Sequence, residues 1–194
     1  MKLVFLLILG LSLTAPALVL ATCPVPGDLA QGITVVFDDG GRETFREVRP
    51  GIVAVYGQDP DGSGYVMTLA QGFHLLETRD LDDLEGALTY DYGMAETALP
   101  VPRPGESRTL AARVTDANGT YDENQVQSYG KALPMDIGTC HYRAFEGLIN
   151  YASGDNYVES ILYLPELGFG FLQWSQSDVD GRNPMTAISI HTGR

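Results

Sequence analysis

The residue types that most often carry chemistry are scarce in this chain of 194 residues. It has two cysteines, Cys23 and Cys140, and three histidines, His74, His141 and His191. No pair of histidines stands at zinc-ligand spacing with a cysteine. Two cysteines far apart in an oxidising compartment are typical of one long-range disulfide, so we expect these two to be bonded. A bonded Cys140 is then no thiol nucleophile for His141.

The sequence predicts no catalytic residues. Serine hydrolases with a nucleophile elbow carry Gly-x-Ser-x-Gly, and Gly62-Ser63-Gly64 lacks its flanking pattern. Paired carboxylates of the glycosidase type are defined only by their spacing in three dimensions, and nothing in the sequence favours them. A hydrolase would show as a cleft in which His74, His141 or His191 lies beside a serine or a carboxylate.

A metal site has one candidate, the run Asp59-Pro60-Asp61-Gly62, which begins like a calcium loop. Calcium needs six or more oxygen ligands, and the twelfth position holds Ala70 instead of glutamate. We therefore interpret the run as a hairpin turn, keep calcium at Asp59 and Asp61 as the alternative, and predict no cofactor. A second acidic run is interpreted as a solvated face and consists of Asp80, Asp82, Asp83 and Glu85.

Aromatic side chains near the C-terminus are the candidates for ligand binding. Aromatic residues on strands mostly form the core, but in a curved sheet they also line apolar cavities. The candidate ligand-binding residues are Tyr157, Tyr163, Phe169, Phe171 and Trp174.

The N-terminus has the pattern of a cleaved secretory signal. Lys2 precedes an unbroken apolar run, and Val19-Leu20-Ala21 offers compact residues for cleavage after position 21. An uncleaved anchor is the alternative, but Pro16 interrupts the run. A lipid-modified Cys23 is another, but Thr22 precedes it where glycine, alanine or serine is usual. We expect residues 1–21 to be removed, a periplasmic or secreted location, and no membrane span in the mature chain.

The mature chain, residues 22–194, is strongly acidic and of a length for one domain. Removing the signal takes away one of 12 basic residues and none of the 25 acidic ones, leaving a formal net charge of −14. Such a chain repels phosphates, which excludes a nucleic-acid partner.

Turn signals every 8 to 12 residues predict an all-β antiparallel fold. Asp38–Gly41 and Asn118-Gly119 are typical hairpin turns. Gly168 and Gly170 within one strand favour a barrel or strongly curved sheet over a flat sandwich. A short helix is predicted over 80–88, and three prolines at 100, 102 and 104 predict an irregular connection. The predicted strands are 33–37, 43–48, 52–56, 65–69, 73–77, 108–115, 120–129, 140–145, 147–151, 157–164, 168–174 and 185–191.

Two parts of the chain share an order of features, which predicts an internal repeat. Units 23–58 and 140–176 each read cysteine, strand, turn, strand, proline turn, strand. Duplication explains this order, and so does the limited chemistry of β-hairpins, so both interpretations stay open.

The segment 157–169 resembles a pattern of uncharacterised periplasmic β-proteins from Gram-negative bacteria. In them a strand that bears an acidic residue, here Glu159, ends in a Pro-Glu-Leu-Gly turn, here Pro165–Gly168. The resemblance covers one hairpin and extends at most over 140–174. It implies a fold shared with curved-sheet carriers and no particular activity.

The sequence as a whole favours a non-catalytic binding or carrier protein. An exported all-β chain without a catalytic motif but with several aromatic strand residues fits binding of an apolar or amphipathic small molecule, or of an envelope protein. The alternatives are a structural or assembly component of the cell envelope and an unrecognised hydrolase.

Overall fold

The computed structural model describes residues 22–83, 86–152 and 156–193. The predicted signal peptide, Glu85 of the second acidic run, and residues 153–155 of the second predicted repeat unit lie outside these ranges. Strands dominate the described chain, with two short 3-10 turns, η1 (Asp28–Ala30) and η2 (Glu96–Ala98). The strands are β1 (Ile33–Phe37), β2 (Arg42–Arg49), β3 (Ile52–Gln58), β4 (Gly64–Ala70), β5 (His74–Asp80), β6 (Leu88–Asp91), β7 (Ser107–Asp116), β8 (Gly119–Tyr129), β9 (Leu133–Ile137), β10 (Cys140–Tyr151), β11 (Val158–Leu164), β12 (Phe169–Ser177), β13 (Gly181–Pro184) and β14 (Ala187–Thr192).

All the strand pairs are antiparallel and belong to one long, strongly curved sheet. Its order is β13-β12-β11-β10-β8-β7-β6-β5-β4-β3-β2-β1-β14, and β9 pairs with the first half of β10. The strands β13 and β14 end this path at opposite edges, and no ladder joins them in the described chain. The sheet is therefore curved but not closed, which confirms the all-β prediction in its curved-sheet form.

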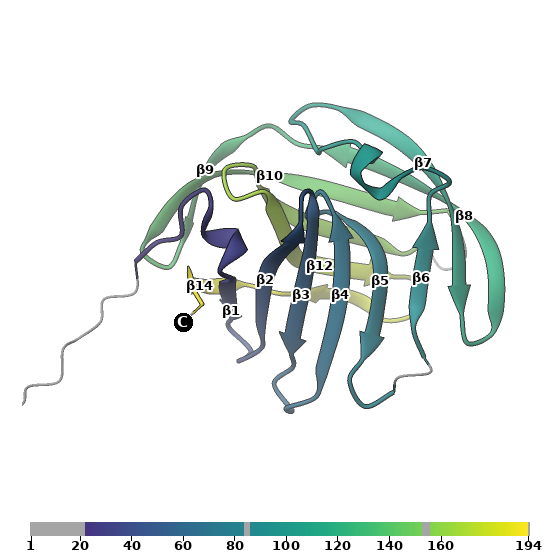
Figure 1. Ribbon diagram of the computed structural model, residues 1–194, viewed down its shortest axis with the longest axis horizontal. Helices are drawn as coiled ribbons and strands as arrows, with labels where there is room; N and C mark the ends of the chain where they lie inside the picture. The colour runs from purple at the N-terminus through teal and green to yellow at the C-terminus, as the bar shows by residue number, and fades with distance from the viewer. Residues whose placement is uncertain (1–21, 84–85, 153–155, 194) are drawn as a thin grey trace, which may run out of the picture.

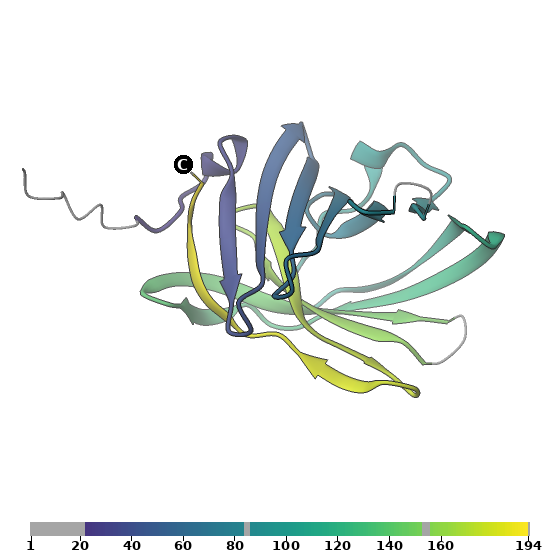
Figure 2. The same ribbon diagram turned by 90° about the horizontal axis from the view of Figure 1, so that it is seen from below.

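The curvature folds the sheet into two layers. Figure 1 shows β1 to β6 side by side in front of β10 and β12, which cross behind them. Seen from below, the blue strands stand away from the green strands, while the yellow β14 lies beside the purple β1 (Figure 2). The layers bury a shared apolar core, in which the Phe45 and Phe169 rings stack with centroids 4.3 Å apart. Core residues from both halves include Val35, Val53, Val55, Leu162, Leu164 and Phe171.

A close backbone contact fastens the two layers where the β4–β5 turn meets the start of β12. The amide of Gly170 donates a hydrogen bond to the carbonyl of Gly72 at 2.9 Å. Gly72 has a φ of 62°, and a Cβ there would lie 2.2 Å from the carbonyl oxygen of Gly168. The Tyr163 hydroxyl donates to the carbonyl of Gln71 beside it. Only glycine lets the backbones approach so closely.

The predicted disulfide is present: Cys23 and Cys140 are bonded, with their Cα atoms 5.5 Å apart. It fixes the start of the described chain to the first residue of β10. Next to it, the Tyr142 hydroxyl donates to the carbonyl of Pro24. The bond closes a loop over 117 positions, so it removes much conformational freedom from the unfolded chain.

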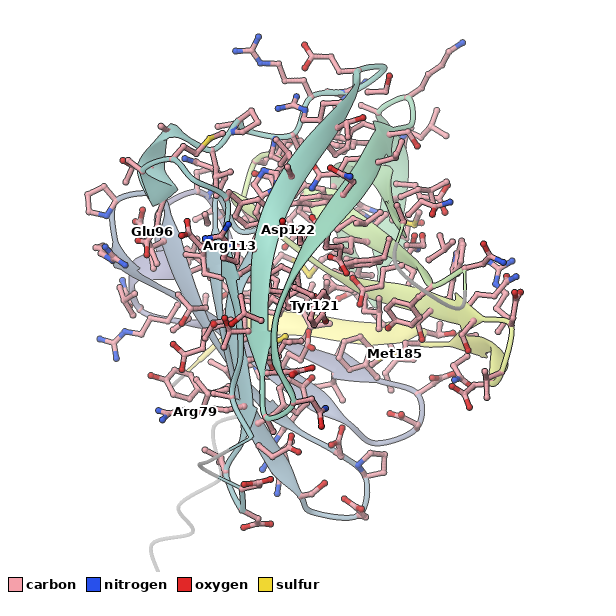
Figure 3. The ribbon with its side chains drawn as sticks, turned by 90° about the vertical axis from the view of Figure 1, so that its right-hand side faces the viewer. Arg79, Glu96, Arg113, Tyr121, Asp122 and Met185 are labelled. Carbon is pink, nitrogen blue, oxygen red and sulfur yellow. A yellow bond between two sulfur atoms is a disulfide. The ribbon has the colours of Figure 1, made fainter. Side chains whose placement is uncertain are left out.

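The asparagine-glycine hairpin forms between β7 and β8. The Asp116 carboxylate accepts hydrogen bonds from the amides of Asn118 and Gly119, which fixes the turn. Figure 3 looks onto this hairpin, and its Arg113 and Asp122 side chains form an ion pair of 3.4 Å. The pair is exposed to solvent and so adds little to stability.

The sequence prediction needs correction at several elements. Asp80 ends β5 and Leu88 begins β6, so the described ends of the predicted 80–88 helix are strands. The strands β5 and β6 pair with each other, Glu77 with Thr89 and Thr78 with Leu88. This pairing satisfies backbone hydrogen-bonding groups on both strands, so the described ends of the segment form strands and not a helix. The strands predicted at 140–145 and 147–151 are one strand, because Gly147 pairs with both neighbouring strands. The prediction missed β6, β9 and β13, which are short or polar and lack a clear alternation.

The two predicted repeat units have corresponding topologies. The strands β1, β2 and β3 form a three-stranded meander, and β10, β11 and β12 form another. The Pro165–Gly168 turn joins β11 to β12, where the amides of Leu167 and Gly168 donate to the carbonyl of Leu164. The duplication itself stays a prediction.

Replacing Gly72 by alanine is expected to destabilise the fold by at least about 2 kcal/mol, because the new methyl group meets the Gly168 carbonyl. Gly62→Ala is the matched control, since Gly62 also has a positive φ but has nothing within 4 Å of its Cβ position. That variant should lose only about 1 kcal/mol, the backbone cost alone. Urea unfolding with the disulfide intact measures the stability of both variants. Equal losses of stability would contradict the role given to the backbone contact at Gly72, which we call the Gly72 corner.

Candidate functional site

A cavity of about 340 Å³ lies between the two layers of the sheet. Its volume is at the lower end of the range of small-molecule sites, about 300 to 1,000 Å³. Most of its wall is apolar, but four carboxylate side chains also face it. The lining residues are Glu43, Phe45, Asp59, Tyr65, Met67, Leu69, Phe73, Leu75, Thr78, Asp80, Ile149, Tyr151, Glu159, Ile161, Gly170, Phe171, Leu172 and Met185.

One wall of the cavity is built from a row of three residues across β2, β3 and β4. Glu43 pairs with Gly57, and Gly57 pairs with Tyr65. A Cβ at Gly57 would lie 2.0 Å from the Tyr65 ring, so the missing side chain lets this ring lie across the middle strand. The Tyr65 hydroxyl thereby reaches Glu43 and donates to its Oε1 at 2.6 Å.

Glu43 is a buried acid with only half of its hydrogen-bonding capacity used. Its exposed fraction is 4%, and Oε2 has no hydrogen-bond partner among the described residues. Burial raises the pKa of Glu43 to about 7, against the lowering effect of the Tyr65 hydrogen bond, and the nearby Asp59 raises it further. Burial and the Glu43 carboxylate together raise the pKa of Tyr65, which therefore stays a donor.

The opposite wall carries a second carboxylate whose oxygens are both satisfied. The Tyr151 hydroxyl donates to Glu159 Oε2 at 2.6 Å, and the Tyr157 hydroxyl donates to Oε1 at 3.1 Å. Burial raises the pKa of Glu159, and these two hydrogen bonds oppose the shift. The two cavity acids thus differ: Glu159 has a donor for each oxygen, and Glu43 has one orphaned oxygen.

A polar ladder runs along the buried face of β8. The Tyr129 hydroxyl donates to Gln127, the Gln127 amide donates to Gln125 Oε1, and the Gln125 amide donates to Glu123. His74 joins it: its Nδ1 lies 3.2 Å from the Gln127 amide, and its Nε2 lies 2.8 Å from the carbonyl oxygen of Pro100. Burial lowers the pKa of His74 to about 4, so its ring is neutral at neutral pH. Its role is structural, tying the proline-rich connection to the sheet.

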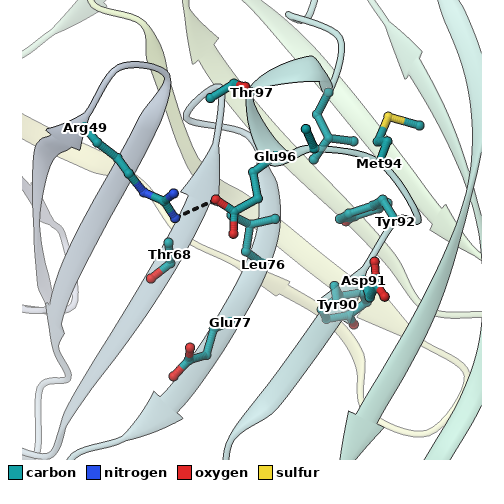
Figure 4. A pocket seen from close by; sticks show the side chains of 12 residues that line it. Arg49, Thr68, Leu76, Glu77, Tyr90, Asp91, Tyr92, Met94, Glu96 and Thr97 are labelled. Atoms are coloured by element: carbon teal, nitrogen blue, oxygen red, sulfur yellow. Dashed lines mark ion pairs between the residues drawn. The ribbon is translucent and has the colours of Figure 1, made fainter.

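A larger and more polar groove, of about 700 Å³, lies under the segment that carries η2. Figure 4 shows Arg49 and Glu96 ion-paired across it, with Tyr90 and Tyr92 along one side. The two tyrosine rings stack with centroids 6.2 Å apart. Its charged pair is satisfied and more than 40% exposed on each side chain, so this groove resembles an ordinary hydrated surface more than a binding site.

The structure separates the five aromatic residues that the sequence offered as ligand contacts. Of the five, Phe171 lines the cavity, and Tyr157 stands behind it as a donor to Glu159. Phe169 is a core residue stacked on Phe45. Two others point elsewhere: Tyr163 packs near Phe73 and Phe145, and Trp174 lies under the Arg182 guanidinium at 4.0 Å.

The Asp59–Gly62 run forms a turn whose carboxylates are used locally. Ser63 donates from its hydroxyl to Asp59 and Asp61, and from its amide to Asp61. These bonds lower the pKa of Asp61. Within the described chain, no group of three or more histidine, cysteine, aspartate or glutamate side chains is arranged to hold a metal ion.

The three histidines lie apart. His74 is in the β8 ladder, and His191 Nδ1 contacts the carbonyl oxygen of Thr192 at 3.3 Å. His141 and Asp136 form a 2.5 Å pair, but both are at least 70% exposed, so they stand on an open surface and not in a cleft. These contacts do not place a histidine beside a serine or a carboxylate in a cleft, which is the arrangement expected of a hydrolase.

Sequence reasoning missed Glu43, Tyr65 and Glu159 as site residues. The signal was present in the strand alternation: Glu43 lies two positions before Phe45, and Glu159 lies two positions before Ile161. Side chains two positions apart on a strand share a face, so a carboxylate in step with apolar core residues points inward. That pattern in the sequence alone indicates a buried acid.

Comparisons with known proteins found one weak structural match. No family model and no curated protein matches the chain. The crystal structure of the hypothetical lipoprotein YmcC from Escherichia coli (K12) is a structural match over 81% of this chain and 87% of that chain. The match has a TM-score of 0.41 and 10% identity, which says nothing of function. In the described residues, no helix is long and apolar enough to cross a membrane.

Replacing Glu43 by glutamine is expected to raise the free energy of unfolding at pH 8 by about 1–2 kcal/mol. The pKa of Glu43 is about 7 in the fold and near 4.5 when unfolded, so the folded state binds more protons between these values and loses stability as pH rises through them. At pH 5 the carboxyl is largely neutral in the fold, and the gain should nearly vanish.

Urea unfolding at both pH values measures the difference between wild type and variant. His74 titrates in both proteins, so its effect cancels. The exposed Glu166, whose replacement by glutamine should change stability little at either pH, is the control. A Glu43→Gln protein that is no more stable than wild type at pH 8 would show that the acid is not strained by burial.

Proposed function

We propose that this chain is an exported, non-catalytic binding protein that takes a small amphipathic molecule into the cavity between its two layers. The observation that carries this is the cavity wall, whose apolar side chains from both layers are joined by the buried Glu43, one carboxylate oxygen of which has no hydrogen-bond partner among the described residues. A protein core normally fills such space and pairs such atoms. A ligand with an apolar body and a polar head does both.

The walls of the cavity are suited to adapt to a ligand. Phe45 and Leu69 come from the N-terminal layer, and Phe171 and Leu172 come from the C-terminal layer. Met67 and Met185 add flexible side chains that repack around different shapes. The two layers are fixed at the Gly72 corner, so the cavity is held open by the architecture and not by a single mobile loop.

Export is the second part of the proposal. Its support is the bond between Cys23 and Cys140, which persists in oxidising compartments, together with the signal-like pattern of residues 1–21. The proposed location is the periplasm or the outside of the cell. A carrier of small molecules there needs no nucleotide, metal or catalytic group to act.

Cavity binding is tested with N-phenyl-1-naphthylamine, an uncharged apolar fluorophore that brightens on leaving water. We expect saturable binding to the wild type, and a loss of affinity of at least about tenfold in Ile161→Trp and in Leu75→Trp, which fill the cavity from opposite layers. Ile188→Trp, at a half-exposed position on β14, is the matched control and should bind like wild type. Equal binding by all four folded proteins would place the probe elsewhere and overturn the proposal.

Processing is tested by expressing the full chain in a Gram-negative host and sequencing the N-terminus of the protein from a periplasmic extract. We expect the mature protein to begin at Thr22, with the disulfide formed. A chain that begins at Met1 would contradict export by cleavage. An acylated Cys23 without a disulfide would instead establish a lipoprotein.

A further inference from the structure

We propose that the ligand of the cavity is an amphipathic cation, whose ammonium group pairs with Glu43 while its apolar body lies between the two layers. This inference rests on the proposed binding function and specifies the chemistry of the ligand. Its starting point is the orphaned atom: Glu43 is 96% buried, is one of the residues that line the cavity, and has no hydrogen-bond partner for Oε2 among the described residues. A buried oxygen of this kind accepts a hydrogen bond from whatever donor enters.

The charges around the cavity select a cation over an anion. The acidic lining residues are Glu43, Asp59, Asp80 and Glu159, and none of the described lining residues is a lysine, arginine or histidine. A carboxylate or phosphate head would meet like charge without any compensating donor of positive charge. Fatty acids and anionic lipids are therefore expected to bind this cavity more weakly than cations.

The placement of the acids also gives a direction of entry. Asp59 and Asp80 are exposed, whereas Glu43 is buried further in. Exposed carboxylates at a mouth attract cations and raise their local concentration. The mature chain carries a strong negative charge overall, so it also attracts cations at longer range.

Glu43, and not Glu159, is the partner of the head group. Both oxygens of Glu159 already accept from tyrosine hydroxyls, whereas Tyr65 supplies only one donor to Glu43. Tyr65 itself cannot turn to the ligand as a donor without giving up that bond. An ammonium group brings several donors and a positive charge, so it satisfies Oε2 and also neutralises the buried acid.

Three probes with one apolar body and different heads test the inference: octylammonium, octan-1-ol and octanoate. Each is measured at pH 8 by its displacement of N-phenyl-1-naphthylamine from the wild-type protein. We expect octylammonium to bind at least about tenfold more tightly than octan-1-ol, and octanoate to bind more weakly than both. In Glu43→Gln the affinities for octylammonium and octan-1-ol should come within about threefold of one another, while octanoate should still bind more weakly because Asp59, Asp80 and Glu159 remain.

Glu166→Gln is the matched control, an acid-to-amide change on the exposed turn before β12, and it should keep the wild-type preference for octylammonium. Circular dichroism and the unfolding curves of the two variants establish that both are folded. A wild type that binds octan-1-ol and octylammonium equally would overturn the cationic head while leaving the cavity function intact. A wild type that binds neither the fluorophore nor any octyl probe would overturn both. Preference retained in Glu43→Gln would assign the head group to another residue and overturn the inference.

Discussion

The two-layered structure depends on the contact between the β4–β5 turn and the start of β12. The hydrogen bond from Gly170 to Gly72 joins segments that are about a hundred positions apart, and no side chain fits between them. This contact sets how far apart the layers stand on either side. The stacked rings of Phe45 and Phe169 fill part of the space between the layers, and the cavity adjoins the contact, since Phe45, Phe73 and Gly170 are among its lining residues. A sheet that is fixed at a corner and open at its edges can hold a void without losing its core.

The cavity acquires its chemistry from strand register. Because Glu43, Gly57 and Tyr65 share one cross-strand row, the glycine in the middle strand lets the tyrosine reach the carboxylate. A one-residue shift of β2 against β3 would turn Glu43 to the other face of the sheet, and a one-residue shift of β4 against β3 would turn Tyr65 away from it. The raised pKa of Glu43 records the free-energy cost of keeping this acid inside. Cores made for stability alone rarely keep such a group, so its place at the wall of a void is the feature that connects the fold to the proposed binding function.

Much of the fold was predictable from local patterns. Turn chemistry located the hairpins at Asp38–Gly41 and at Asn118-Gly119, and the two cysteines had one partner each. The errors occurred where local pattern and tertiary environment differ. The 80–88 segment has leucines at helical spacing, but its ends pair with neighbouring strands. The strand β9 contains a proline at a sheet edge, and β13 is exposed throughout, so neither shows the alternation by which strands are recognised. Of the aromatic ligand candidates, Phe171 lines the cavity. The other four do not, because aromatic side chains on strands mostly fill the core.

The sequence by itself determined the acidic charge, the pairing of the two cysteines, the all-β class and most of the strands, since these follow from composition, turn residues and alternation over a few positions. Only the tertiary structure decided that the sheet stays open, that its halves face one another, and that Glu43 and Glu159 come to line one void with unequal numbers of donors. The physical reason is that strand alternation assigns a side chain to a face but not to a neighbour. Which residues meet across the layers depends on the curvature of the whole sheet. Glycines in one segment can favour curvature, but its amount is a sum over many strands.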